Sequence, residues 1–236
     1  MMSSAKPFYP MLTGNQLKLF ALISMTVDHL GRTLWPQVIL LQILGRLSFP
    51  IFAYMIAEGC LHTKDRKKYL LSILLIAAVC QIVFFVAEGS LYMSSLVAFC
   101  MSLCLIYTLE RAFKRKTCQN WIVAALVFLA IFVITVVLPI LITNIEFEVD
   151  YGFWGVLMPV GVYFAKRKPY KLLIVAVLLL LLSITDFAVQ TWSLLTLIPL
   201  ALYNGKRGTA KLKYFFYLYF PLHLAAIHLI SLICWH

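Results

Sequence analysis

The run Trp121–Ile142 contains no charged side chain, and it constrains the fold of this chain more than any other feature. A helix needs about 20 such residues to cross the hydrocarbon core of a bilayer. Leu172–Ile184 is a second run that is too long and too apolar for a strand in a soluble core. Only 12% of the 236 residues are charged and 63% are hydrophobic, whereas soluble domains have about 25% charged residues. Because backbone polar groups in a bilayer must pair internally, the sequence predicts an all-α, polytopic membrane bundle.

About nine transmembrane helices are predicted, within a range of eight to ten, in a single domain over residues 1–236. Pro50 is expected to bend the second helix, and the sixth and eighth helices are short for a full span. The expected helices cover residues 16–34, 38–61, 69–86, a stretch from just after 90 to 109, 121–142, 151–165, 171–184, 192–203, and 214 to the end.

The net charge of +11 would suit a nucleic-acid ligand, but the positions of the basic residues argue against one. Sixteen of the 20 Lys and Arg residues lie in four short loops, at residues 64–68, 111–116, 166–171 and 206–213. The alternate connections, near residues 35–38, 88–91, 143–151 and 186–191, contain neither Lys nor Arg. Basic loops of membrane proteins face the cytoplasm. The pattern therefore predicts a multi-pass protein of the inner (cytoplasmic) membrane, surrounded by lipid, with its amino terminus inside.

The cysteines do not indicate a metal site. Most of them lie within apolar runs, and none forms a Cys-x-x-Cys pair or a Cys and His spacing typical of metal ligands. We expect them to pack as small hydrophobic side chains, and we expect no bound metal. The six are Cys60, Cys80, Cys100, Cys104, Cys118 and Cys234.

Charged residues interrupt the first two predicted helices. Asp28 and His29 lie ~10 Å below the outer end of the first helix, and Arg46 lies ~12 Å below the outer end of the second. A short link joins these helices into a hairpin, so the three side chains are expected at matching depth. Each charge costs roughly 2.5–3.5 kcal/mol on insertion scales. Either Asp28 pairs with Arg32 or Arg46 to hold the helices together, with His29 hydrogen-bonded nearby, or the group forms a functional site.

Three further features are candidates for a site. Glu58 lies near the cytoplasmic end of the second helix, where the loop at residues 64–68 would neutralise it if it has no role of its own. His223 follows Pro221 near the middle of the membrane, and this proline loosens its helix. The segment Tyr203–Gly208 combines two glycines with two cations. Such a loop is suited to cradling phosphates, or it is only a topology signal that contacts lipid headgroups.

A family resemblance rests on four groups of residues spread over nearly the whole chain. They are Leu17-Lys18 through Met25-x-x-Asp28-His29-x-Gly31; Gly45-Arg46-x-x-Phe49-Pro50 through Tyr54, Glu58-Gly59, and His62-Thr63 with Tyr69; Asp150-Tyr151-Gly152 with Gly155-Val156-Leu157; and Tyr203–Gly208 through Tyr217-x-x-x-Pro221-x-His223-Leu224. In these groups the sequence resembles the TraX family. The named member of that family is a membrane protein that acetylates the amino terminus of conjugative F-type pilin, and it is related to wider membrane acyltransferases.

The resemblance implies an acetyltransferase that uses acetyl-CoA as acyl donor. The expected acceptor is extracytoplasmic or membrane-borne, either a pilin-like protein or a glycan, modified on nitrogen or oxygen. The phosphates of CoA would bind at the cytoplasmic cations. The residues expected to bind them are Lys206, Arg207, Asn204 and Lys211.

We expect the polar residues that interrupt the predicted helices to catalyse the acetyl transfer. His29 would act as general base or carry the acetyl group transiently. Arg46 would stabilise the developing oxyanion or orient Asp28. His223 is an alternative to His29, and the sequence does not choose between them. The residues expected to bind the acceptor are Asp150, Tyr151 and Glu58.

Two other classes of function fit the same residues. A proton-coupled transporter or lipid translocase would use Asp28, Glu58 and His223 as a proton relay. A non-catalytic assembly factor in the membrane would need none of these roles. Binding of acetyl-CoA separates the transferase from both.

Overall fold

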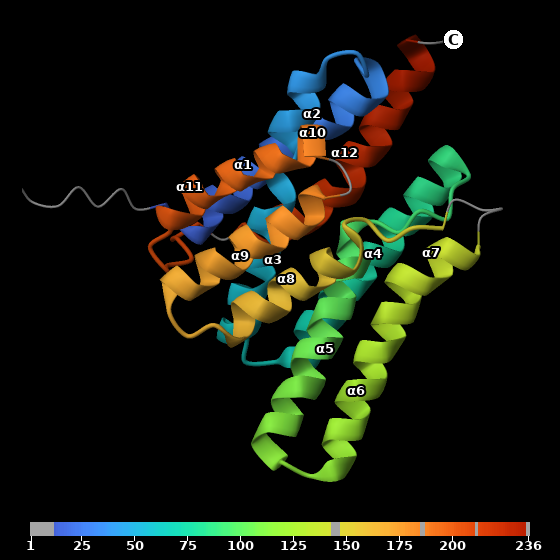
Figure 1. Cartoon of the computed structure of the whole chain (residues 1–236). Helices are drawn as coiled ribbons and strands as arrows, with labels where there is room; N and C mark the ends of the chain where they lie inside the picture. The colour runs from blue at the N-terminus through green and yellow to red at the C-terminus, as the bar shows by residue number, and fades with distance from the viewer. Residues whose placement is uncertain (1–11, 143–146, 185–186, 211, 235–236) are drawn as a thin grey trace, which may run out of the picture.

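The protein is helical throughout the part that the structure describes, which is residues 12–142, 147–184, 187–210 and 212–234 of a computed structural model (Figure 1). The non-helical pairings between described residues are two isolated bridges, Leu12 with Tyr203 and Met93 with Val149. Each of the predicted helical segments has a helical counterpart. The all-α fold class is therefore confirmed.

The second predicted helix breaks before Pro50 rather than at it. Helix α1 (Gly14–Leu34) forms a hairpin with α2 (Ile39–Gly45), and α3 (Ser48–His62) follows after Arg46 and Leu47. Pro50 occupies the third position of α3, where a missing N–H costs no intrahelical bond. Its ring would clash with the carbonyl of Arg46, four residues earlier, if the helix ran straight through. The break therefore falls at Arg46 itself, one turn earlier than predicted.

The next three helices are long, and the fourth has only four residues. They are α4 (Arg66–Glu88), α5 (Ser95–Arg115), α6 (Cys118–Phe132) and α7 (Leu138–Leu141). One wide π turn, Val133–Val137, joins α6 to α7. Pro139 lies directly after this turn and has no N–H to give to the carbonyl of Thr135, so the local backbone widens instead of continuing as α-helix.

The last third of the chain contains shorter helices and one long one. They are α8 (Gly152–Phe164), α9 (Lys168–Ser183), α10 (Phe187–Gln190), α11 (Leu197–Ala201) and α12 (Lys213–Cys234). The stretch between α10 and α11, Thr191–Thr196, is a 3₁₀ helix. The predicted helix at 192–203 is therefore partly 3₁₀ and ends at Ala201.

Five helices of the described residues are long and apolar enough to span a membrane, by length and composition. They are Ile39–His62 (α2 and α3 together), Arg66–Val86, Ser95–Arg115, Cys118–Leu141 and Phe215–Ile233. Helix α1 is equally long but carries Lys18, Asp28 and Arg32. Large apolar side chains cover the outside; for example, Val86 is 78% exposed and Ile140 is 70% exposed. Such a surface fits lipid rather than water. The predicted nine spans stay a prediction, because α8 has only 13 residues.

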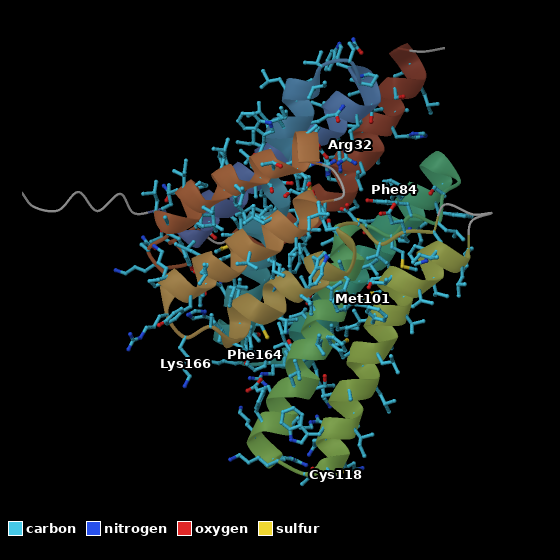
Figure 2. The ribbon with its side chains drawn as sticks, viewed as in Figure 1. Arg32, Phe84, Met101, Cys118, Phe164 and Lys166 are labelled. Carbon is cyan, nitrogen blue, oxygen red and sulfur yellow. The ribbon has the colours of Figure 1, made fainter. Side chains whose placement is uncertain are left out.

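The basic connections lie at one end of the molecule, and the links after α1 and α4 lie at the opposite end (Figure 1). The turns after α3, α5, α8 and α11 lie along the left and lower sides of the molecule in this view, while the links after α1 and α4 and the end of α12 lie along its upper and right sides. Lys166 and Cys118 mark the first end in Figure 2, which we call the basic end, and Arg32 and Phe84 lie toward the other. This alternation is what the charge pattern predicts. The orientation of the basic end toward the cytoplasm stays a prediction.

Helices α3 and α8 form the centre of the bundle. Ile51, Ala53 and Ala57 on α3 are fully buried, and α3 packs against α1, α5 and α8. The hydroxyl of Ser102 on α5 donates to the carbonyl of Val156 on α8 at 2.7 Å. This buried contact holds α5 directly against α8.

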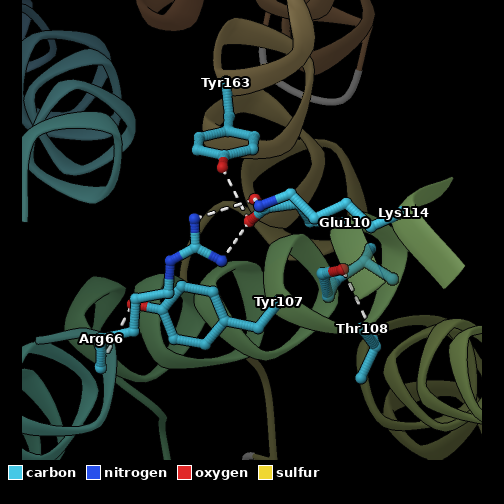
Figure 3. A network of polar contacts seen from close by, with 7 residues as sticks. Arg66, Tyr107, Thr108, Glu110, Lys114 and Tyr163 are labelled. Carbon is cyan, nitrogen blue, oxygen red and sulfur yellow. Dashed lines mark hydrogen bonds and ion pairs between the residues drawn. The ribbon is translucent and has the colours of Figure 1, made fainter. Parts of the chain in front are cut away.

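A carboxylate at the basic end joins three helices (Figure 3). Glu110 on α5 accepts hydrogen bonds from Arg66 on α4 and, at 2.9 Å, from the Tyr163 hydroxyl on α8. Lys114, one turn along α5, also pairs with it at 2.5 Å. The guanidinium of Arg66 lies 5.6 Å from the centroid of the Tyr107 ring. These contacts account for Glu110 as a structural residue that fixes α4, α5 and α8 relative to one another.

Candidate functional site

A cavity of about 420 Å³ lies toward the end of the bundle opposite the basic end. Its walls come from α1, α3, α4, α5 and α12 and from the connections before α5 and α8. Phe49, Phe52, Phe84 and Phe99 contribute an apolar wall. Its charged, tyrosine and histidine side chains are Asp28, His29, Arg32, Tyr92, Asp150, Tyr151, His223 and His228, and Thr33, Ser48, Ser94 and Ser95 add hydroxyl groups. The cavity thus gathers residues from both ends of the sequence into one site.

His29 on α1 and His223 on α12 are direct partners in this site. Nδ1 of His29 lies 3.0 Å from Nε2 of His223, and the two ring planes are parallel within 6°. One turn away, the hydroxyls of Thr26 and Tyr219 lie 2.7 Å apart. Because residues three or four apart share one face of a helix, these contacts join a single stripe of α1 to a single stripe of α12. The sequence left His29 and His223 as alternatives, and the structure makes them a pair.

Asp28 pairs with Arg32, one of the two partners that the sequence allowed. Its Oδ2 lies 3.0 Å from Nε of Arg32. Its other oxygen is buried against Gly45 on α2. Arg46, the next residue, is close enough to interact electrostatically with Asp28 and Asp150 and to hydrogen-bond Tyr151. The expected meeting of Asp28 and Arg46 is therefore present, with Arg32 rather than His29 as the direct partner of the carboxylate.

Gly45 is the position that lets α1 and α2 approach at Asp28. A Cβ at residue 45 would lie 2.5 Å from the carboxyl carbon of Asp28. We expect Gly45→Ala to lower the free energy of unfolding by about 1–3 kcal/mol, because the carboxylate and its helix must shift. Thermal unfolding in detergent micelles measures the change. The matched control is Gly14→Ala, whose Cβ would have no contact nearer than 3.5 Å. Equal melting temperatures for both variants would contradict this packing.

Asp150 is held in the connection before α8, outside the helices. The Tyr92 hydroxyl donates to its Oδ1 at 2.7 Å. Backbone bonds of Met93 to Glu148 and Asp150, at 2.7 and 2.8 Å, join the two connections. Burial raises the pKa of Asp150 to about 6, although the Tyr92 hydrogen bond and the charges of Arg32 and Arg46 oppose this rise. The carboxyl group is therefore near its titration midpoint at a mildly acid pH.

Glu58 lies away from the cavity, in a buried ion pair. Its Oε1 is 2.5 Å from Nζ of Lys171 on α9, and each side chain is only 11% exposed. The same Nζ lies 5.7 Å from the centroid of the Tyr54 ring. The cationic partner of Glu58 is therefore Lys171, and not the loop at residues 64–68. Its expected contact with an acceptor stays a prediction, in a place separate from the histidine pair.

The predicted CoA-binding loop is anchored to the start of α1. The carbonyls of Lys206 and Arg207 accept from the amides of Gly14 and Asn15 at 2.8 and 2.9 Å. Both side chains are exposed, so their charges are available at the surface. The side chain of Asn204 accepts from the amide of Lys206 and shapes the loop. Lys211 lies outside the described residues.

This loop is far from the histidine pair. His29 is 14 residues beyond Asn15 on the same helix, which is ~21 Å at 1.5 Å per residue. Buried side chains of Leu22, Met25 and Phe216 pack together in the intervening region. A donor bound at the loop would therefore have to extend an arm between α1 and α12 to reach the cavity.

The sequence pattern does not mark three residues that belong to these sites: Arg32, Tyr92 and Lys171. The sequence indicates Arg32 only as an ion-pair partner of Asp28, yet Arg32 also lines the cavity beside Asp28. Tyr92 carries no charge that would mark it in the sequence, and Lys171 belongs to one of the four basic loops. A lysine at the start of a predicted span, facing a glutamate at equal depth on another, was the one signal that could have identified Lys171.

Comparison with known proteins gives a consistent family. A family model described as "TraX protein" matches residues 13–231. The chain is 28% identical to "Probable fimbrial assembly protein FimC, serogroup H1" of Dichelobacter nodosus, over 90% of this chain and 93% of that protein. It is 42% identical to "Uncharacterized protein RP591" of Rickettsia prowazekii over 38 residues, 16% of this chain and 15% of that protein. No solved structure matches it. Because the family match covers nearly the whole chain, the resemblance in its motifs is confirmed, and this membrane protein belongs to the TraX family.

Proposed function

We propose that this protein is a membrane-embedded acetyltransferase that moves an acetyl group from acetyl-CoA to an amine or hydroxyl of an extracytoplasmic or membrane-borne acceptor. The observation that carries the proposal is the His29–His223 pair in the wall of a cavity that also holds Asp28, Arg32 and Asp150. The family, and the fimbrial assembly name of the relative from Dichelobacter nodosus, favour a pilin-like acceptor. The positive loops favour the inner membrane as the location, with the basic end inside.

The proposed reaction needs one base and one positive group in the cavity. An acceptor amine that binds as its cation first loses one proton to solvent. A histidine of the pair then removes a second proton from this nitrogen, or the proton of a hydroxyl acceptor, as the nitrogen or oxygen attacks the carbonyl carbon of the thioester. The carbon–sulfur bond then breaks, and the CoA thiolate takes the proton from the imidazolium. The guanidinium of Arg32 lines the cavity and is suited to stabilise the oxyanion. Arg46, which is near Asp28 and Tyr151, is suited to hold these neighbours in place.

Asp150 is the proposed contact for a cationic acceptor amine. Its buried carboxyl group has a pKa of about 6, whereas a peptide α-amine titrates near pH 8 and is charged below that. Lowering the pH through about 6 protonates Asp150 and removes its attraction for the amine. We therefore expect the dissociation constant of an acceptor peptide, measured without acetyl-CoA, to rise as the pH falls from 7 to 5. Asp150→Asn should bind weakly across this range; an unchanged pH dependence in that variant would contradict the assignment.

Transfer of radiolabelled acetyl groups tests the proposed function. Membranes containing the protein are incubated with labelled acetyl-CoA and compared with membranes lacking it. The proposal expects label on a membrane-borne or added amine acceptor, and a thermal shift of the purified protein with CoA. Absence of both contradicts it. A proton relay through Asp28, Glu58 and His223 is not favoured, because Glu58 is paired with Lys171 rather than joined to the cavity.

A further inference from the structure

Hydrogen bonds within the protein engage both ring nitrogens of His223, so neither is free to take a proton from the molecule that receives the acetyl group. Its Nδ1 lies 2.9 Å from the carbonyl oxygen of Tyr219. A carbonyl oxygen only accepts hydrogen bonds, so this nitrogen carries a proton. In the neutral ring Nε2 is then the unprotonated nitrogen, and it faces Nδ1 of His29 at 3.0 Å. Both nitrogens of His223 are therefore engaged within the protein.

The direction of the bond between the two rings also determines which nitrogen of His29 carries the proton. Because Nε2 of His223 accepts, Nδ1 of His29 must be the donor of the bond between them. The remaining nitrogen of neutral His29, Nε2, then carries a lone pair. Within the described residues, no hydrogen bond engages this atom, and the His29 side chain lines the cavity. In water, neutral histidine favours the opposite tautomer, with its proton on Nε2, so the protein selects the less common form.

We propose that Tyr219 and His223 are positioning residues that hold His29 in its Nδ1–H tautomer, so that Nε2 of His29 is the atom that accepts the proton of the acceptor. This assignment rests on the proposed acetyl transfer for its catalytic meaning. The tautomers themselves follow from hydrogen-bond direction alone. The choice between His29 and His223 as base is thereby made in favour of His29.

Tyr219 also fixes how α12 lies against α1. The Thr26 hydroxyl has one proton, which it gives to the carbonyl of Leu22 at 2.9 Å. The Tyr219 hydroxyl must therefore be the donor in its 2.7 Å contact with Thr26. The Tyr219 ring also lies parallel to that of His223, within 12° and at 5.2 Å between centroids. A shift of α12 along α1 would break this contact and the histidine pair together.

The carboxylate next to His29 in the sequence does not orient its ring, and His223 does. Asp28, the adjacent carboxylate, pairs with Arg32 and packs against Gly45, and it forms no described contact with the His29 ring. His223 is thus the group that orients the His29 ring, a role that a carboxylate plays in other base–orienter pairs.

Nitrogen NMR of the tautomers tests the assignment without any activity. Protein labelled with ¹⁵N-histidine is measured in detergent micelles at a pH where both rings are neutral, with signals assigned from His29→Gln and His223→Gln. The proposal expects both rings to carry their proton on Nδ1. In His223→Phe, which has no acceptor for His29, the His29 signal should move toward the ordinary Nε2–H tautomer. A wild-type His29 with its proton on Nε2 overturns the proposal, even if the protein transfers acetyl groups.

Activity of the same variants separates positioning from proton transfer. Gln at position 223 can still accept from Nδ1 of His29 but cannot act as a base. We expect His223→Gln to retain more activity than His223→Phe, whose kcat should fall by up to about 10⁴-fold with little change in KM, as when a catalytic histidine loses the partner that fixes its tautomer. An inactive His223→Gln beside an active His29→Gln would make His223 the base and overturn the assignment. If the wild type transfers no acetyl group, the proposed function fails while the tautomer result stands.

Discussion

Replacing His29 with glutamine is expected to lower the rate of acetyl transfer by about 10²–10⁴-fold, the usual contribution of a general base. Glutamine keeps a similar size and polarity, so α1 should still pack against α12. The lost function is proton acceptance at Nε2 of His29, which no hydrogen bond engages among the described residues, while the side chain lines the cavity. Initial rates with saturating labelled acetyl-CoA and a fixed acceptor measure the effect on kcat.

His62→Gln is the matched control for this experiment. His62 is exposed at the end of α3, at the basic end, where its Nδ1 bonds the carbonyl of Glu58 at 2.8 Å. We expect its transfer rate to equal that of the wild type. A His29→Gln enzyme as fast as His62→Gln would remove His29 from the mechanism.

Breaking the Glu58–Lys171 pair is expected to cost about 3–5 kcal/mol of folding free energy, because it leaves one buried charge without a partner. Glu58→Gln and Lys171→Met should therefore both melt at much lower temperature than the wild type. The double variant Glu58→Leu with Lys171→Met has no buried charge, and it should regain much of the loss. Denaturant and thermal unfolding in mild detergent measure all three.

Glu148→Gln provides the control, since this carboxylate is exposed in the connection before α8. Surface changes of this kind stay within about 0.5 kcal/mol of the wild type. If the double variant is as unstable as the single ones, the ion pair is not the source of the loss. If it is also inactive while well folded, the pair has a role in acceptor or donor binding beyond stability.

The relative level of Asp28 and Arg46 along the first two helices was the part of the site that the sequence predicted. Loop charges placed Asp28 and Arg46 at the same level, and the structure brings Asp28 against Gly45, the neighbour of Arg46. The helix positions were also predictable, since apolar runs and basic loops mark them directly. The break at Arg46 was misplaced by one turn, because proline distorts the turn that precedes it rather than its own position.

The histidine pair could not be predicted, because its members lie 194 residues apart and belong to the first and last helices. Hydropathy gives the order and direction of helices but not which helix faces which. The tautomers depend on one backbone carbonyl, that of Tyr219, and no sequence pattern records its position. The Glu58–Lys171 pair was missed for a similar reason, since Lys171 was grouped with a loop although it faces the core.

Acetyl transfer from the inside to the outside of sealed proteoliposomes tests most directly the central claim, which is acetyl transfer that depends on His29. Protein is oriented with its basic end inside the vesicle, labelled acetyl-CoA is enclosed, and a peptide with a free amino terminus is supplied outside. We expect label on the outer peptide with wild-type protein, and little or none with His29→Gln. A wild type that leaves the peptide unlabelled while binding CoA, or a His29→Gln variant that labels it at the wild-type rate, would contradict this mechanism.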